Sequence, residues 1–270
     1  MIPSLPEVVT EVLRLMNDTS TDIADFERPL RNDAALVARV LRLVNSPFYG
    51  LEKKVTTITE GVTFLGFRSL RSLVLATTTA TLLDRDFHCY GHGSRGLWHH
   101  SVGVAAASRY LAQHLRRGRA LAEEVFVAGL VHDIGKMLLE PYLAVAGVDV
   151  MTLGRPAQEV ERNSIGLDHQ EAGAIIAEKW NLSPLVISVL AHHHDEGGDD
   201  EYREARAIVR LADAVVHGSM VGYSNGVTLE KTPRPADLEL LGLNTEEWTA
   251  IETGMLEAMV VAVEAMGSPA

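Results

Sequence analysis

Apolar residues recur along this chain at the spacing of an α-helix. One such stretch consists of Val8, Val9, Val12, Leu13 and Met16. Residues spaced by three or four positions share one face of a helix, so this stretch predicts an amphipathic helix. The same spacing returns in nearly every apolar segment, and the β-branched residues lie within it. The pattern therefore predicts an all-α protein with minimal strand content.

Helix-breaking and helix-starting residues set the expected boundaries. The principal helices are expected at about 33–44, 57–65, 69–83, 97–116, 121–139, 170–180, 184–193, 201–216 and from 245 onward. Gly66 should separate two of them, Pro141 should end the helix at 121–139, and Thr245 should cap the last one. The stretches expected to be irregular are 147–166 and 218–236.

The stretch from Asp84 to Gly96 is the best candidate for a linker. It mixes charges and carries three glycines, two histidines and Cys89. We therefore predict an N-terminal helical bundle over residues 1–84, packed on a second helical domain over 97–217. A loop and a helix over 218–270 should follow.

Charge and composition restrict the partners. Acidic residues outnumber basic ones by 36 to 24, and the net charge is −12. A broad nucleic-acid surface needs clustered positive charge, so none is expected. The single cysteine excludes an internal disulfide and fits a reducing compartment. There is no signal-peptide pattern and no apolar run near the ~20 residues of a membrane span, so we expect a cytoplasmic protein without a membrane partner.

Histidine and aspartate residues form the candidate chemistry. His132 and Asp133 stand side by side after the strongly apolar stretch 121–130. Their companions along the chain are His99, His100, Asp168, His169, His192, His193, His194 and Asp213. Imidazole and carboxylate together suit divalent metal ions. Asp213 lies on an otherwise apolar helix face, where a carboxylate is costly to bury unless a cation or a metal pairs with it.

The order of these residues, a histidine, then His-Asp, then a late aspartate, resembles the HD superfamily of metal-dependent phosphohydrolases. The resemblance implies an HD-type helical domain whose core metal ligands are His100, His132, Asp133 and Asp213. The N-terminal half is similar to the HDOD family, a bacterial signalling branch of that superfamily. The motifs that carry this similarity are Asn32-Asp33-Ala34-Ala35-Leu36, Leu41 through Gly50, Thr57-Ile58 and Phe64-Leu65-Gly66. They fall in the expected order, and the resemblance runs from about Ile2 to His217.

Three further residues extend the candidate site. His169 and His193 or His194 stand where the related HD-GYP phosphodiesterases carry additional ligands, so the resemblance implies a second metal or a wider shell. Alternatively, the three consecutive histidines only favour the dipole of a helix C-terminus. Lys136 is a candidate catalytic residue that neutralises a phosphate oxygen, or else a solvated lysine at a helix end. Whether one or two ions bind, and whether they are Fe, Mn, Mg, Ni or Zn, stays open.

Asn45, Ser46 and Pro47 follow the helix that Asp33 opens. They could form a small polar binding motif. Such side chains more often tie up free carbonyls and amides at a helix end, and we favour that interpretation.

Two departures from the HD-GYP pattern weigh against a working phosphodiesterase. The Gly-Tyr-Pro element is absent after the histidines, where residues 197–201 stand instead, and Gly96 occupies a position where that group can place a glutamate ligand. We therefore predict a regulatory binding or output module of bacterial signal transduction with a retained metal site. Its expected partners are a signalling protein and a nucleotide or cyclic dinucleotide. The alternatives are a metal-dependent phosphohydrolase or phosphodiesterase, and a structural domain that keeps the ion only to hold its helices together.

Overall fold

The computed structural model describes residues 4–17, 23–30, 33–195, 200–223 and 232–266. Within these residues the regular elements are all helices, so the predicted all-α class is confirmed. The helices are α1 (Glu7–Asn17), α2 (Ile23–Leu30), α3 (Ala34–Val44), α4 (Ile58–Leu82), α5 (Gly96–His114), α6 (Gly118–Val131), α7 (Lys136–Ala146), α8 (Ala157–Ile165), α9 (His169–Lys179), α10 (Pro184–His192), α11 (Arg203–Gly218), α12 (Pro235–Leu241) and α13 (Thr245–Met266). Two short 3-10 helices are η1 (His88–Tyr90) and η2 (Val150–Leu153).

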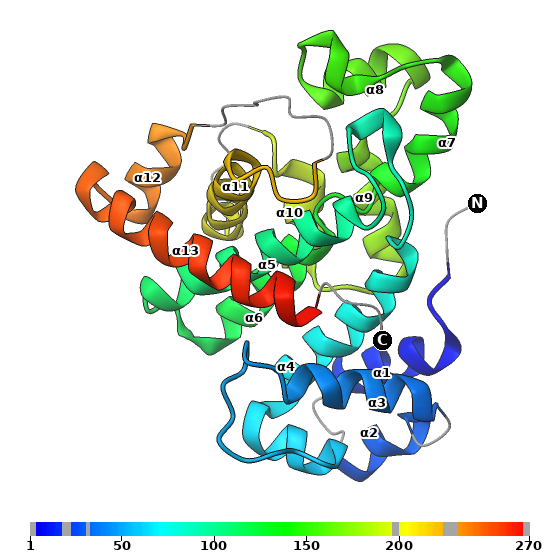
Figure 1. The fold of residues 1–270 in the computed structure, drawn as a ribbon, viewed down its shortest axis with the longest axis vertical. Coiled ribbons are helices and arrows are strands. Elements are labelled where there is room, and N and C mark those ends of the chain that lie inside the picture. The colour runs from blue at the N-terminus through cyan, green and yellow to red at the C-terminus, as the bar shows by residue number, and fades with distance from the viewer. Residues whose placement is uncertain (1–3, 18–22, 31–32, 196–199, 224–231, 267–270) are drawn as a thin grey trace.

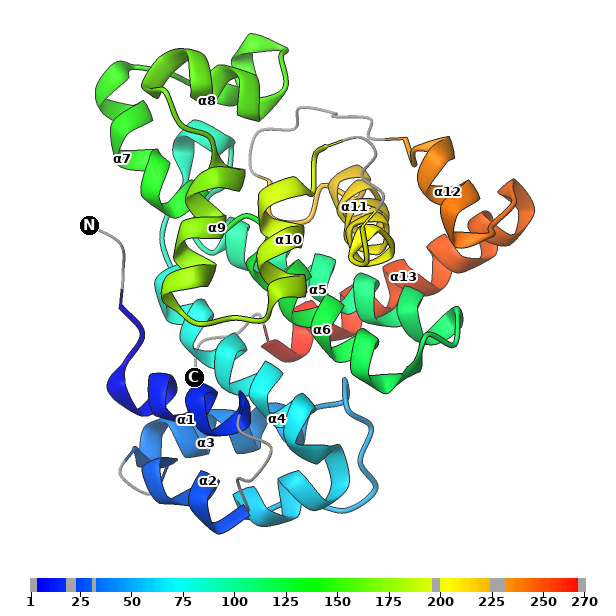
Figure 2. The same ribbon diagram turned by 180° about the vertical axis from the view of Figure 1, so that it is seen from behind.

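The helices form three groups along the long axis of the molecule (Figure 1). Helices α1 to α4 lie at one end, and α7 and α8 lie at the other. Between them, α5 packs against α6, α11 and α13, and α9 packs against α10. Figure 2 shows the same order from behind, with α9 and α10 toward the viewer. None of the helices in the described part of the chain is long and apolar enough to cross a membrane.

Polar residues end and begin α3 as predicted. Asp33 caps it, since its carboxylate accepts the backbone N–H of Leu36 at 2.8 Å. At the other end, the Asn45 amide donates to the carbonyls of Leu41 and Val55, both at 2.7 Å. Its oxygen accepts the N–H of Val55 at 2.7 Å. The helix-end interpretation of Asn45 is confirmed, and the same side chain also holds the loop that follows α3.

Helix α4 joins the N-terminal helices to the middle group. Gly66 interrupts it with a φ of 76°, so the predicted break between two helices is present as a kink. The residues after the kink are buried on nearly all sides and pack against α6, as their uniformly apolar sequence predicts.

A buried arginine connects the N-terminal helices to the middle group. Arg109 of α5 forms an ion pair with Glu123 of α6, and both side chains are buried. The guanidinium also lies 5.0–5.2 Å from the ring centroids of Phe48, Tyr49 and Phe126. Phe48 and Tyr49 belong to the loop after α3, so this loop packs the N-terminal helices onto α5 and α6 through cation–π contacts.

Pro141 does not end a helix, contrary to the prediction. Helix α6 ends at Val131, and Pro141 lies inside α7. A proline in a helix leaves the carbonyl four residues earlier, here that of Met137, without its helical donor. Arg85 supplies a donor, since its guanidinium donates to that carbonyl at 2.8 Å. The chain therefore breaks between α6 and α7, and this turn carries the His-Asp pair.

Residues 84–96, the predicted linker, pack closely against the rest of the protein. Phe87, Tyr90 and His92 are almost fully buried, and the N–H of Cys89 donates to Glu140 of α7 at 3.2 Å. Gly91 allows a tight turn in this segment, since it has a φ of 70°. The segment forms one wall of the candidate site. A domain boundary at residue 84 remains a prediction.

Three further boundaries differ from expectation. The stretch 147–166 contains η2 and α8, and α12 begins within the stretch 218–236, of which residues 224–231 lie outside the described residues. Thr245 is not the cap of α13. Asn244 takes that role, because its side chain accepts the N–H of Glu247 at 2.9 Å while the Glu247 carboxylate accepts the N–H of Asn244 at 3.0 Å.

Candidate metal centre

The His-Asp pair lies in the turn between α6 and α7. The N–H of Ile134 donates to Val131 O, and that of Lys136 to Asp133 O, both at 3.0 Å, so the chain stays tightly wound through the turn. Gly135 allows α9 to approach this turn, because a Cβ atom there would lie 2.0 Å from the carbonyl oxygen of His169. The absence of a side chain at residue 135 thus brings His169 next to Asp133.

The first group of ligand atoms comes from three helical segments. His100 of α5, His132 and Asp213 of α11 are buried, and one ligand atom from each lies within 4.8 Å of the others. His100 Nε2 is 3.2 Å from Asp213 Oδ1, and His132 Nε2 is 3.2 Å from Asp133 Oδ2. His100 lies in the second turn of α5 and is fully buried.

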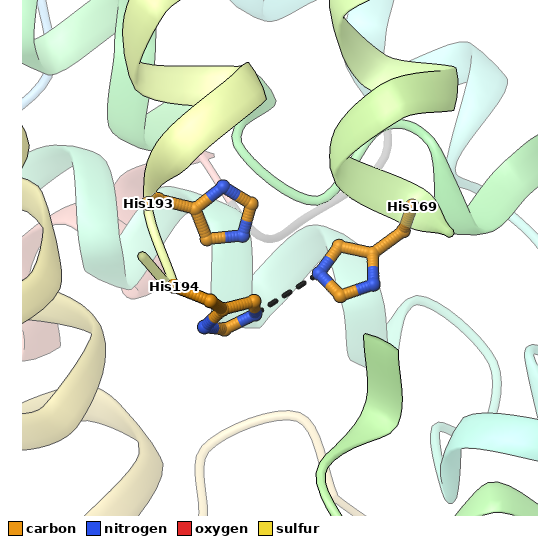
Figure 3. Close-up of side chains that lie close together, drawn as sticks. All are labelled: His169, His193 and His194. Carbon is orange, nitrogen blue, oxygen red and sulfur yellow. Dashed lines mark hydrogen bonds between the residues drawn. The ribbon is translucent and has the colours of Figure 1, made fainter. Parts of the chain in front are cut away.

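The second group consists of His169, His193 and His194, whose rings converge at the start of α9 and the end of α10 (Figure 3). The Nε2 atoms of His169 and His194 lie 3.0 Å apart. Asp133 Oδ1 faces this group, at 3.6 Å from His169 Nε2 and 3.9 Å from His193 Nε2. Asp133 therefore lies between the two groups and turns one carboxylate oxygen toward each.

Hydrogen bonds on the outer side of the rings fix their orientation. His132 Nδ1 is 2.8 Å from Gly129 O, and His193 Nδ1 is 3.0 Å from Leu190 O. His169 Nδ1 is 2.7 Å from the carboxylate of Glu161. These partners only accept, so in the neutral form of each ring Nδ1 carries the proton and Nε2 presents its lone pair to the interior of the site.

Burial and neighbouring charges have opposite effects on pKa values at the centre of the site. Burial lowers the pKa of His100 and His193 and keeps both imidazoles neutral, the form that binds metal. Burial also disfavours the charged form of His132, but the Asp133 carboxylate outweighs it and raises the pKa of His132. Burial would raise the pKa of Asp133, but His132 and Lys136 hold it well below its usual range. Asp133 is thus an anion whose Oδ2 is paired with Lys136, while its Oδ1 has no hydrogen-bond partner among the described residues.

The donor set fits divalent ions. Buried atoms without a well-oriented hydrogen-bond partner among the described residues include His100 Nε2, His132 Nε2, Asp133 Oδ1 and His193 Nε2. Buried polar atoms are rarely left unpaired, and the convergence of these atoms fits the ligand set of a cation. Two ligands at right angles on an ion, with bonds of about 2.1 Å, lie about 3.0 Å apart. The separations of 3.0 and 3.2 Å given above match that geometry.

Lys136 and a cavity adjoin the two groups. Lys136 is buried, not solvated, and its Nζ lies 2.6 Å from Asp133 Oδ2 and 5.2 Å from the centroid of the Tyr90 ring. A cavity of about 460 Å³ opens beside it, and its lining includes Asp133, Asp213, His194, Arg155 and Arg234. Of the loop 197–201 expected to follow the histidines, residues 197–199 lie outside the described residues.

Residues 2–196 match the family model of the HDOD domain. The chain belongs to the HDOD domain family. This confirms the resemblance drawn from the N-terminal motifs, among them Leu41 through Gly50, and from the His-Asp pair. In this HDOD chain, the loop motif forms the packing joint with Arg109, and the His-Asp pair forms the centre of the candidate site.

Two relatives share part of the HDOD chain. It is 25% identical over 220 residues to an uncharacterized protein of Treponema pallidum (strain Nichols), covering 80% of this chain and 42% of that protein. It is 36% identical over 98 residues to the cyclic di-GMP phosphodiesterase of Pseudomonas aeruginosa, covering 36% of this chain and 22% of that protein. The chain thus spans less than half the length of these relatives.

Two crystal structures share the fold. An HDOD domain protein from Geobacter sulfurreducens has a TM-score of 0.77 at 23% identity, over 98% of this chain and 93% of that one. A protein from Shewanella amazonensis has a TM-score of 0.75 at 22% identity, over 98% of this chain and 94% of that one. At this identity the likeness concerns the fold alone.

All seven residues expected at the site of the HDOD chain lie together: His100, His132, Asp133, Lys136, His169, His193 and Asp213. His194, which the sequence left as an alternative to His193, joins them as well. Glu161 was not expected at the site, because it belongs to a stretch predicted to be irregular. Gly96 has no room for a side chain, since a Cβ atom there would lie 2.1 Å from Gly222 O, so a glutamate ligand has no counterpart at that position.

Proposed function

We propose that this chain is a regulatory HDOD module of bacterial signalling that holds two divalent metal ions at its histidine and aspartate cluster. The observation that carries the proposal is the position of Asp133, whose two oxygens face the two groups separately. The first ion would take His100, His132, Asp213 and Asp133 Oδ2. The second would take His169, His193, His194 and Asp133 Oδ1.

The cavity beside the site supports a phosphate-bearing ligand. Lys136, Arg155 and Arg234 contribute three cationic side chains to its lining, and such groups pair with phosphate oxygens. Similarity to a cyclic di-GMP phosphodiesterase supports a nucleotide or a cyclic dinucleotide as that ligand. Bound ions would add Lewis acidity at the phosphate, while Lys136 would hold one of its oxygens. Helices α1 to α4 contribute no residue to the proposed ligand sets, which supports their use as a surface for a signalling protein.

Metal analysis and a chelator test the ion site. Purified protein should contain one or two divalent ions per chain, and a chelator should lower the melting temperature because an ion stabilises the folded state by mass action. Asp213→Ala should remove most of this response. Glu239→Ala, which removes an exposed carboxylate from α12, should keep it. Protein without an ion, together with a melting temperature that the chelator leaves unchanged, would refute the metal site.

Hydrolysis of a phosphodiester is the second candidate function. It is favoured by Asp133, because a carboxylate between two ions is suited to a pair of ions that act on one phosphate. Metal-loaded protein should be incubated with cyclic di-GMP and with bis(p-nitrophenyl) phosphate, beside Asp133→Asn as the inactive control. Turnover that Asp133→Asn abolishes would make the chain an enzyme. Binding of cyclic di-GMP without turnover supports the regulatory module.

A further inference from the structure

His92 is a fully buried histidine in the segment that connects α4 to α5. Phe87 and His92 exchange two backbone hydrogen bonds at 2.9 and 3.1 Å, so the chain between them forms a tight hairpin around η1. A second isolated bridge joins His92 to Tyr223, and the two rings lie 4.3 Å apart. The position of His92 is therefore fixed on both sides by backbone contacts.

The hydrogen bonding of the His92 ring is that of a metal ligand. Nδ1 lies 2.9 Å from Gly222 O and donates to it, because a carbonyl only accepts. Nε2 carries the lone pair, is buried, and has no hydrogen-bond partner among the described residues. His132 and His193 show the same arrangement, with Nδ1 on a backbone carbonyl and an unpaired, buried Nε2.

The ring also adjoins the first group of ligands. Its centroid lies 5.9 Å from that of His100. Charged groups that act on the ring include Lys136 and Asp133, both of which belong to the site. The His92 ring therefore lies beside residues of the candidate site.

Gly222 links His92 to the position where a ligand is missing. Its carbonyl group leaves no room for a side chain at Gly96, one turn before His100. The same carbonyl oxygen accepts the Nδ1 proton of His92. The carbonyl that excludes a side chain from residue 96 thus also holds the His92 ring in place.

We propose that His92 is an additional nitrogen ligand of the ion held by His100, His132 and Asp213. This inference rests on the ion of the proposed function. Because His92 comes from the segment between α4 and α5, ion binding would tie the N-terminal helices to the metal centre. A shift of α4 relative to α5 would then alter the affinity for the ion. In a regulatory module, this would couple the N-terminal helices to the metal centre.

Two substitutions separate ligation from the structural contact. In His92→Asn the side-chain amide nitrogen occupies the place of Nδ1, so the hydrogen bond to Gly222 O is kept and the ligand nitrogen is lost. In His92→Gln the terminal group reaches the place of Nε2, so a ligand atom is kept and the bond to Gly222 O is lost. His88→Asn is the matched control, because His88 lies in the same hairpin and its side chain is 78% exposed.

Binding of Mn²⁺ to the metal-free proteins is then measured by titration calorimetry, and coordinated nitrogens are counted by pulsed EPR. His92→Asn should bind the first ion about 10- to 100-fold more weakly and lose one nitrogen signal, with the metal-free melting temperature close to wild type. His92→Gln should melt lower when metal-free and keep more of the affinity. His88→Asn should match wild type.

A cycle with Asp213→Ala identifies the ion concerned. If both residues bind the same ion, His92→Asn should have little further effect on Mn²⁺ affinity in the Asp213→Ala background. Unchanged affinity and nitrogen count in His92→Asn would overturn the inference, as would greater loss of affinity in His92→Gln than in His92→Asn. Wild-type protein that binds no Mn²⁺ would instead remove the proposed function on which the inference rests.

Discussion

Glu161 and His169 form a hydrogen-bonded pair that is completely buried at the edge of the metal centre. The Glu161 carboxylate lies 2.7 Å from His169 Nδ1 and also accepts the backbone N–H of His169 at 2.8 Å. Burial would raise the pKa of Glu161, but its contacts with His169 outweigh this and lower it, so the carboxylate is ionised. An anion on Nδ1 fixes the proton there and makes Nε2 a better ligand.

Glu161→Gln should therefore weaken binding of the second ion by about 10- to 100-fold, because an amide is a weaker acceptor and can also impose the wrong tautomer on His169. Titration with Mn²⁺ should show this loss in the second binding step while the first step is preserved. Glu159→Gln is the matched control, since Glu159 lies on the same helix with its side chain about half exposed. Equal affinities for wild type and Glu161→Gln would show that Glu161 has no positioning role.

Local patterns predicted most of the helices because each buries one apolar face. Asp33 and Asn45 were identified as helix-end residues because capping depends on a few neighbouring positions. The prediction that Pro141 ends a helix was wrong, because the hydrogen-bond donor that its helix needs comes from Arg85, more than fifty residues earlier in the chain. No local pattern contains such a contact.

The same distinction separates the site residues. The core histidines and aspartates were found through their order in the chain, which resembles a known family. Glu161 and His92 could not be found in this way, since each reaches the site only through packing of a segment that looks like a loop in the sequence. The buried carboxylate of Glu161 in α8 reaches the site because α8 packs against α9. The buried imidazole of His92, in the hairpin at 87–92, reaches it because Gly96 and Gly222 are in contact.

Asn45→Ala should destabilise the fold by about 1–3 kcal/mol. The substitution removes two hydrogen bonds donated to Leu41 O and Val55 O, and it leaves the N–H of Val55, a buried residue, without its acceptor. Urea unfolding measures the change. Glu52→Ala, an exposed position in the same loop, should unfold like wild type. If both variants unfold alike, the loop contributes little to the stability of the N-terminal helices.

Arg109→Met should destabilise the protein by about 3–5 kcal/mol, since it leaves the Glu123 carboxylate buried without its cation. The double variant Arg109→Met/Glu123→Leu should recover part of that loss, because no unpaired charge remains. Arg14→Met removes an ion pair on the surface, where the Arg14 side chain is 59% exposed, and should change stability by less than about 1 kcal/mol. Urea unfolding that ranks the buried and the surface variants equally would contradict the role of Arg109 as the joint between α5, α6 and the loop after α3.

Acid should destabilise the metal-free protein at pH values where its carboxylates are still ionised. Burial lowers the pKa of His92 to about 3, and it also lowers the pKa of His100 and of His193. An unfolded histidine binds its proton near pH 6.5, whereas these native imidazoles stay neutral. Below pH 6.5 the unfolded state therefore binds more protons, and the free energy of unfolding falls as the pH falls.

The expected slope is at most about 1.4 kcal/mol per pH unit for each such histidine. His132 acts in the opposite sense at higher pH, because Asp133 raises its pKa and its protonation above pH 6.5 favours the folded state, whereas below pH 6.5 it is protonated in both states and adds no slope. Urea unfolding of metal-free protein between pH 7.5 and 5 should thus show a clear loss of stability. His92→Asn should reduce the pH dependence of the free energy of unfolding by up to the contribution of one proton, because an amide does not titrate. His88→Asn should leave this pH dependence unchanged. A free energy of unfolding that stays constant across this range would mean that the buried imidazoles take up protons in the folded state as readily as in the unfolded state. That result would contradict the neutral form, with a free lone pair, that metal ligands require.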